Sequence, residues 1–252
     1  MNRGAPPDPW HRLRALTAAR IAIGRAGGSL PTREMLSFSL DHARARDAVH
    51  QALDRAALQE ALRERGLRGL SVHSAAADRA EFLRRPDLGR RLTADSRARL
   101  QAAGEDTGYD LALVLADGLS AIAVQRHALA LLDALLPPLS DWRLAPIVIA
   151  EQARVALGDD IGAALGARQV VMLIGERPGL SSPDSLGLYL THEPRPGRSD
   201  ADRNCLSNVR PEGLAPAAAA RRLDHLIRGA RALGASGIAL KDDFSEDGPA
   251  LA

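Results

Sequence analysis

Short apolar runs alternate with amphipathic stretches in the second half of this chain, and this alternation limits the fold more than any other feature. We expect strands over residues 110–116, 146–150, 169–175, 187–191 and 237–240, and helices over 120–136, 159–167 and 216–233. Continuous apolar runs are typical of strands that are buried on both faces. Their alternation with helices predicts a mostly parallel sheet with helices on both sides.

The first half of the chain has a different composition and charge pattern. From about residue 10 to residue 100, Ala, Leu and Arg dominate, and charges recur three to four positions apart. This spacing is typical of helices, and no β pattern stands out. We therefore predict an α/β protein in which an N-terminal helical domain, residues 1–105, precedes a Rossmann-like, mostly parallel sheet domain, residues 106–252.

Composition excludes several classes of protein. The chain has 252 residues, with 33 basic and 31 acidic side chains and only 3% aromatic residues. This small positive excess does not favour nucleic-acid binding, which requires a clustered basic surface with stacking aromatics. No apolar run reaches the roughly 18–20 residues that span a bilayer, and no secretory signal is seen. Since Cys205 is the single cysteine, an internal disulfide is impossible. We expect a cytoplasmic protein without membrane contacts.

Ligands of open α/β sheets bind beyond the carboxyl ends of the strands. Two segments are expected there: residues 176–185, directly after the third predicted strand, and residues 192–213, a polar stretch with four arginines. A structureless loop as long as the second is functional or disordered in most compact domains. A solvated surface loop explains its composition equally well.

Two side chains in these segments are candidate contacts, each with an alternative. Glu176 follows a buried strand, so its carboxylate could accept hydrogen bonds from ligand amides or hydroxyls, or form a structural ion pair with an arginine such as Arg177. Cys205 could be a small hydrophobic residue, or a thiol made reactive by nearby arginines. Gly158, Gly162 and Gly166 form a smooth helical strip for a flat ligand or for close packing on the sheet.

Familiar catalytic signatures are absent from the sequence. There is no G-x-G-x-x-G after a strand, no phosphate-binding loop and no G-x-S-x-G turn. Histidines and carboxylates do not have metal-ligand spacing. The residues therefore predict a binding domain, with neither a catalytic residue nor a metal ligand of its own.

Seven segments of the chain resemble one family, the small subunits of ethanolamine ammonia-lyase. They are RIAIGRAGGSLPT (20–32), DHARARDAVH (41–50), RRPDLGRRL (84–92), ADGLSA (116–121), RVALGDDIG (154–162), IGERPGLSSPDSLGLYLT (174–191) and RNCLSNVRPEGL (203–214). The resemblance covers most of the chain from about residue 8 to residue 242. The run IGERPGLSSPDSLG is its most specific part.

This resemblance implies an ammonia-lyase that is active only with a large subunit and that uses adenosylcobalamin in a radical conversion of ethanolamine to acetaldehyde and ammonia. The large subunit would be a TIM barrel with the substrate site, and the small subunit would hold the cobalamin against it. Equal numbers, six of each, would form the hetero-oligomer. The family's cobalamin contacts carry over to Val155 in RVALGD, Glu176 in IGERPG and Cys205 in RNCLSN.

Some expectations concern the cofactor and the setting of the enzyme. The motif Asp-x-His-x-x-Gly, whose histidine ligates cobalt in many cobalamin proteins, is absent. We therefore expect base-on cobalamin without a protein histidine ligand. Packaging in a bacterial microcompartment is doubtful, because only about eight Pro- and Gly-rich residues precede the resemblance. Two alternatives remain: a subunit that only stabilises the large one, and a nucleotide-dependent transferase that acts alone.

Overall fold

Six strands form one sheet in the order β1-β3-β2-β4-β5-β6. This computed structural model describes residues 9–17, 19–25, 27–105 and 108–245. The first four strands in this order are parallel, whereas β5 and β6 are antiparallel to their neighbours. The strands are β1 (Gly69–His73), β2 (Tyr109–Ala116), β3 (Ile147–Glu151), β4 (Ala167–Gly175), β5 (Leu186–His192) and β6 (Arg203–Val209).

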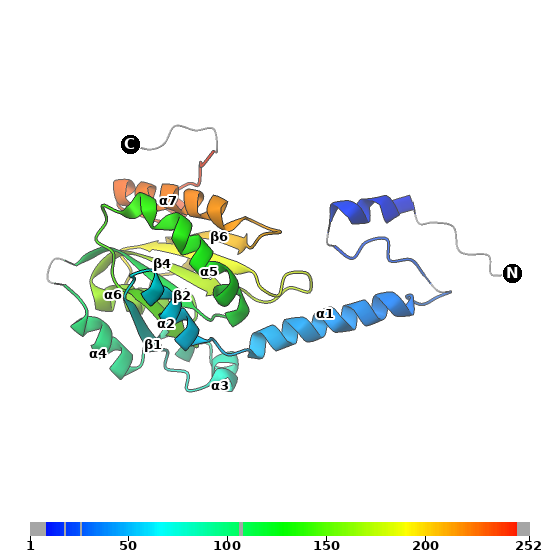
Figure 1. Ribbon diagram of the computed structural model, residues 1–252, viewed down its shortest axis with the longest axis horizontal. Coiled ribbons are helices and arrows are strands. Elements are labelled where there is room, and N and C mark those ends of the chain that lie inside the picture. The colour runs from blue at the N-terminus through cyan, green and yellow to red at the C-terminus, as the bar shows by residue number, and fades with distance from the viewer. Residues whose placement is uncertain (1–8, 18, 26, 106–107, 246–252) are drawn as a thin grey trace.

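Helices cover both faces of the sheet (Figure 1). One face packs against α2 (Arg55–Glu64), α5 (Ala121–Leu135) and α7 (Pro216–Leu233), and the other packs against α4 (Ala94–Ala102) and α6 (Leu157–Leu165). The remaining helices are α1 (Thr32–His50), α3 (Arg79–Arg84) and the short 3-10 helices η1 (Pro9–Leu16), η2 (Leu88–Arg90), η3 (Pro137–Leu139), η4 (Asp200–Asp202) and η5 (Gly237–Ala239). The predicted α/β class with a mostly parallel sheet is confirmed, while its division into a helical and a Rossmann-like domain stays a prediction.

Strand β2 shows why the apolar runs are continuous. Leu111, Leu113 and Leu115 belong to the core under α5 and α7, whereas Ala112 and Val114 belong to the core under α6. Successive side chains of a strand point to opposite faces. A central strand with a core on each face therefore needs an apolar residue at every position.

The glycine strip of α6 serves close packing. A Cβ at Gly158 would lie 2.7 Å from Met172 of β4, and one at Gly162 would lie 2.4 Å from Pro194. Gly166 is outside the strip, because it ends the helix in a left-handed conformation with φ +67°. Of the two interpretations of this strip, close packing on the sheet is the one that the structure shows.

Three expectations about strands are wrong. The first half does contain a strand, β1, which has a weak pattern because it is an edge strand with only Val72 buried. Residues 192–213 are not one loop, since they include η4 and the edge strand β6. Residues 237–240 form η5 rather than a strand, with Gly237 at φ +73° and its N–H donating to Asn204 Oδ1.

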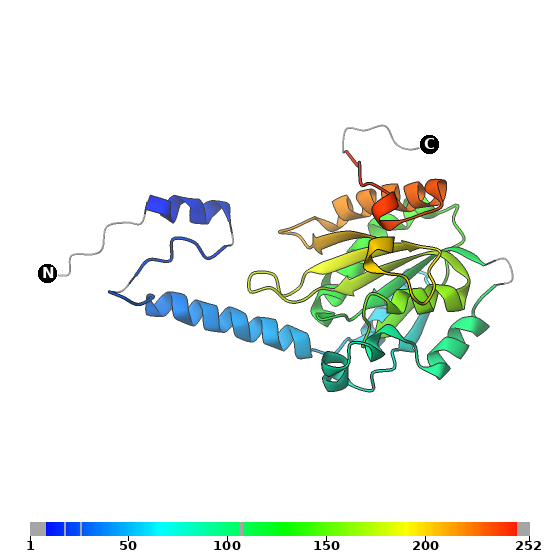
Figure 2. The same cartoon turned by 180° about the vertical axis from the view of Figure 1, so that it is seen from behind.

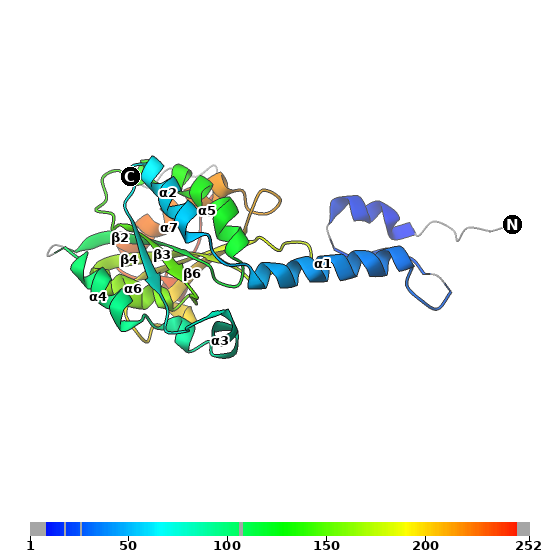
Figure 3. The same ribbon diagram turned by 60° about the horizontal axis from the view of Figure 1, so that its bottom comes forward.

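Helix α1 projects from the body of the protein, and η1 lies beside its far part (Figures 2 and 3). Ala48 is its only buried residue, and Met35, Leu36, Phe38 and Leu40 are between 46% and 63% exposed. Apolar side chains exposed on a projecting helix are typical of surfaces that another chain covers. In the described part of the protein, no helix combines the length and the apolar character required to cross a membrane.

Candidate functional site

A pocket of about 380 Å³ lies at the carboxyl ends of β2, β3 and β4. We call it the carboxyl-end pocket, and it is lined by Gly118, Leu119, Ala153, Arg154, Val155, Ile174, Gly175, Glu176, Arg177 and Tyr189. Its position is the one at which ligands bind in open α/β sheets. The segment after β4, residues 176–185, borders it as the sequence predicted.

Two glycines bring the ends of β2 and β4 together at the floor of this pocket. Leu119 N–H donates to the Gly175 carbonyl at 2.9 Å. A Cβ at Gly118, where φ is +55°, would lie only 2.2 Å from the Gly175 oxygen. A Cβ at Gly175 would lie 2.0 Å from the Ser120 oxygen. The backbone therefore forms the floor, and larger residues at these positions would push the two ends apart.

Asp117 holds the loop that carries Val155. Its carboxylate, which is 4% exposed, accepts hydrogen bonds from Gln152 N at 2.8 Å and Ala153 N at 2.9 Å. Gln152 has the unusual φ of +53°, which these bonds stabilise. Arg79 lies 3.6 Å from the same carboxylate. Burial, which outweighs these contacts, raises the pKa of Asp117 to about 6.

Val155 and Arg154 lie together on one side of the pocket. Val155 is half-buried against the core under α6 and offers an apolar surface. The Arg154 guanidinium stacks on the Phe82 ring at 4.2 Å and donates from Nη2 to the Phe82 carbonyl. Its buried Nε has no hydrogen-bond partner among the described residues. This N–H is therefore a donor without an acceptor at the edge of the pocket.

Glu176 follows β4 directly and lines the pocket. Its carboxylate accepts hydrogen bonds from Ser185 Oγ and from Asn208 N, the latter at 3.1 Å. Gly187 makes room for this side chain, because a Cβ there would lie 3.0 Å from Glu176 Oε1. No arginine pairs with Glu176 among the described residues, so the alternative of a structural ion pair is not what the structure shows.

Cys205 lies on β6, opposite Tyr189 in the register of β5 and β6. It is exposed and does not line the pocket itself, but Tyr189, which does, contacts its thiol. Loss of solvation raises the pKa of Cys205, and the Glu176 carboxylate adds to this effect. No arginine among the described residues acts on this pKa, so the structure does not favour the alternative of an arginine-activated thiol. The structure brings Val155 and Glu176 to one pocket and places Cys205 one residue beyond its wall.

Sequence reasoning missed Asp117, Arg79, Arg154 and Tyr189. The signal for Asp117 was available, since Asp117-Gly118 ends a buried strand at the edge where ligands bind. The pocket offers an apolar surface, one carboxylate and one hydrogen-bond donor without a partner. Such a lining can bind a ligand that has both an apolar face and polar side groups. The described residues contain no cluster of three His, Cys, Asp or Glu side chains that could hold a metal.

Comparison with known proteins shows the family of this chain. The family model of the ethanolamine ammonia-lyase light chain matches residues 7–241. Among curated proteins, the ethanolamine ammonia-lyase small subunit of Azotobacter vinelandii is 60% identical over 95% of this chain and 90% of its own length. That of Xanthomonas campestris pv. campestris is 56% identical, covering 94% and 89%, and that of Pseudomonas syringae pv. tomato is 55% identical, covering 96% and 86%. This chain therefore belongs to the family of ethanolamine ammonia-lyase small subunits, also called light chains.

Proposed function

We propose that this chain is the small subunit of a cytoplasmic, adenosylcobalamin-dependent ethanolamine ammonia-lyase and that it holds the cobalamin against a large subunit. The observation that carries the proposal is the family match over residues 7–241, together with a pocket where a Rossmann-like sheet would bind its ligand. When bound, the cofactor would supply the radical chemistry that converts ethanolamine to acetaldehyde and ammonia.

The residues present fit one side of such a cofactor. A corrin has apolar ring faces and amide side groups around its edge. Val155 and Leu119 would contact the apolar part, and the Glu176 carboxylate would accept hydrogen bonds from amide N–H groups. The unpaired Nε of Arg154 would donate to an amide or phosphate oxygen. A pocket of about 380 Å³ holds only part of so large a molecule, which is consistent with a site completed by the second subunit.

Cys205 would contact the same cofactor beyond Tyr189. We propose that the cobalamin keeps its own base on cobalt, without a protein histidine ligand. The chain's residues then bind, orient and shield the cofactor, while the substrate site and the catalytic side chains belong to the large subunit, a TIM barrel. A subunit can thus be necessary for activity without an acid, base or nucleophile of its own.

The exposed apolar side chains of α1 support a large partner. Met35, Leu36 and Phe38 lie on a helix that projects from the body and are about half exposed or more. We propose that α1 contributes to the contact with the large subunit, in an assembly with equal numbers, six of each. Analytical ultracentrifugation of the mixed subunits gives the stoichiometry.

The test of this function is an ammonia-release assay with ethanolamine and adenosylcobalamin. It compares the chain alone, the cognate large subunit alone, and both together. Activity only in the mixture supports the proposal. Equal activity of the large subunit alone would make this chain a purely stabilising subunit, and activity of this chain alone would favour an independent enzyme.

A further inference from the structure

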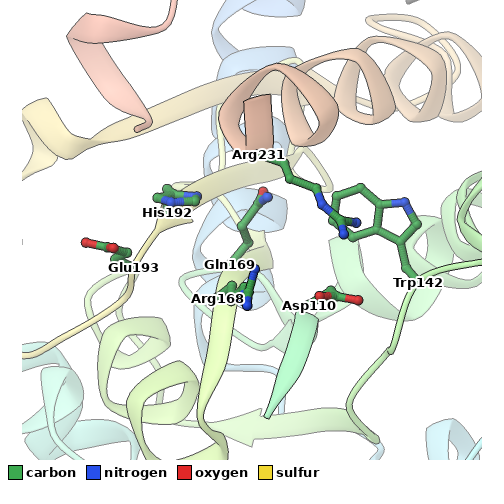
Figure 4. A pocket seen from close by; sticks show the side chains of 7 residues that line it. All are labelled: Asp110, Trp142, Arg168, Gln169, His192, Glu193 and Arg231. Carbon is green, nitrogen blue, oxygen red and sulfur yellow. The ribbon is translucent and has the colours of Figure 1, made fainter. Parts of the chain in front are cut away.

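A second pocket lies at the opposite edge of the sheet, where the parallel strands begin (Figure 4). It has a volume of about 250 Å³. Asp110 and Gln169 lie near the starts of β2 and β4, and His192 ends β5. Arg231 is near the end of α7, and Trp142 precedes β3. We call it the amino-end pocket. It shares no residue with the carboxyl-end pocket, and the proposed function does not use it.

The amide of Gln169 gives this pocket a polar interior. The residue is 1% exposed, and its Nε2 donates to the Ile227 carbonyl of α7 at 3.2 Å. This bond fixes the orientation of the amide, so that Oε1 is left without a hydrogen-bond partner. A buried amide oxygen without a donor is unfavourable. An N–H or O–H group in the pocket would remove that cost.

His192 adds a second polar atom without a partner. Its Nδ1 is buried and has no hydrogen bond among the described residues. Burial lowers the pKa of His192 and outweighs the Glu193 carboxylate, which acts in the opposite direction. The ring is therefore neutral near pH 7. In Figure 4, Gln169 stands between this ring and the side chain of Arg231.

The lining carries two carboxylates, Asp110 and Glu193, and two guanidinium groups, Arg168 and Arg231. Asp110, which is 7% exposed, already contacts Arg143, and Glu193 lies 3.6 Å from Arg198. Arg231, in contrast, stacks on the Trp142 indole at 4.5 Å and has no carboxylate within ion-pair distance in the described chain. Arg168 likewise has none there. These two guanidinium groups come from different elements, α7 and β4. Asp110 acts on Arg231 through its charge without an ion pair between these two described side chains, so both groups can still donate hydrogen bonds to an anion.

We propose that the amino-end pocket binds a small phosphate monoester that carries an amine or hydroxyl group. A phosphate monoester has three terminal oxygens, which allow it to reach both Arg231 and Arg168. Guanidinium groups recognise phosphate well. The amine or hydroxyl donates to Gln169 Oε1. The volume is below the range of about 300–1,000 Å³ for drug-sized ligands, so the ligand is small. Trp142 and the Arg231 side chain together form one wall of the site.

The test is isothermal titration calorimetry of the full chain, alone and assembled with the large subunit. Three probes separate the two parts of the ligand: O-phosphorylethanolamine, inorganic phosphate and ethanolamine. We expect O-phosphorylethanolamine to bind at least tenfold more tightly than phosphate. Arg231→Gln should lower its affinity about tenfold, and Gln169→Leu should remove its advantage over phosphate. Arg221→Gln, ten positions earlier on α7 and thus about 15 Å away, is the matched control.

Two outcomes would overturn the proposal. One is the absence of saturable binding of O-phosphorylethanolamine at millimolar concentration. The other is equal affinity in Arg231→Gln and the unchanged chain, which would indicate adventitious binding only. Since Arg231 is exposed, its variant serves even where Gln169→Leu fails to fold. Cobalamin titration of the same proteins is read separately, so that failure of the proposed function is distinguishable.

Discussion

Arg203 and Asp159 form a doubly hydrogen-bonded ion pair inside the protein, with Nη1–Oδ1 and Nη2–Oδ2 both at 2.7 Å. Their side chains are 3% and 2% exposed. Arg203 also donates to Thr191 Oγ1 and to the Arg198 carbonyl. The pair joins α6, just after Val155, to β6, two residues before Cys205. It thus connects the helix that follows Val155 to the strand that carries Cys205.

Removing one member of this pair should be costly. Arg203→Met leaves the Asp159 carboxylate buried without its cation, and we expect a loss of about 3–5 kcal/mol in the free energy of unfolding, measured with urea. The double variant Arg203→Met with Asp159→Leu should recover much of this loss. Arg99→Met, which breaks an exposed pair with Asp95, should change little. Equal losses in Arg203→Met and Arg99→Met would contradict a stabilising role of the buried pair.

Asp117 predicts a pH dependence of stability. Burial raises its pKa from 3.8 to about 6, so between these values the folded protein holds a proton that the unfolded chain has lost. The stabilisation that this bound proton contributes is therefore full below pH 4 and is lost as the pH rises through 6. Over this range the free energy of unfolding falls by about 3 kcal/mol. Relative to Asp117→Asn, the unchanged protein should lose unfolding free energy between pH 4 and 7. A constant difference would contradict the raised pKa.

Gly118 predicts a steric effect that can be isolated. Gly118→Ala and Gly234→Ala both place a Cβ at positive φ, +55° and +69°, which by itself costs about 1 kcal/mol. Only at Gly118 does the Cβ meet backbone, the Gly175 oxygen at 2.2 Å; at Gly234 nothing lies within 4 Å. We expect Gly118→Ala to lower the melting temperature clearly more than Gly234→Ala does. Equal shifts would mean that the two strand ends separate easily.

Glu176→Gln tests the proposed cobalamin contact. The variant keeps the size of the side chain but loses the charge and one acceptor oxygen, so we expect cobalamin affinity of the assembled enzyme to fall about tenfold, equal to about 1.4 kcal/mol. Glu212→Gln, whose side chain is 72% exposed, is the control. Unchanged affinity together with a lower melting temperature would assign Glu176 a structural role, through Ser185 and Asn208.

Cys205 should react slowly with alkylating reagents. Its pKa is raised, mainly by loss of solvation, so little thiolate is present at pH 7 although the residue is exposed. We expect iodoacetamide to modify it more slowly than free cysteine, and cobalamin to slow the reaction further in the assembled enzyme. Mass spectrometry over time measures both rates. Faster reaction than that of free cysteine would contradict the raised pKa.

The sequence by itself determined the alternating α/β pattern and the family. Strands β2, β3 and β4 are apolar at nearly every position because both of their faces are buried, and a local pattern records such burial directly. The end of α7 is equally local, since Gly234 can take the left-handed conformation that stops a helix. Val155 and Glu176 could be placed near the carboxyl ends of strands for the same reason.

Only the tertiary structure decided the two edge strands and the partners of the buried charges. β6 has the polar sequence RNCLSNV, and it can lie in the sheet because Asp159, 44 positions away, neutralises Arg203. Asp117 anchors the loop after β3 through backbone N–H groups that no sequence pattern reveals. The amino-end pocket likewise unites β2, β4, β5 and α7. Such contacts depend on which distant segments meet, and those meetings are determined only when the whole core is packed.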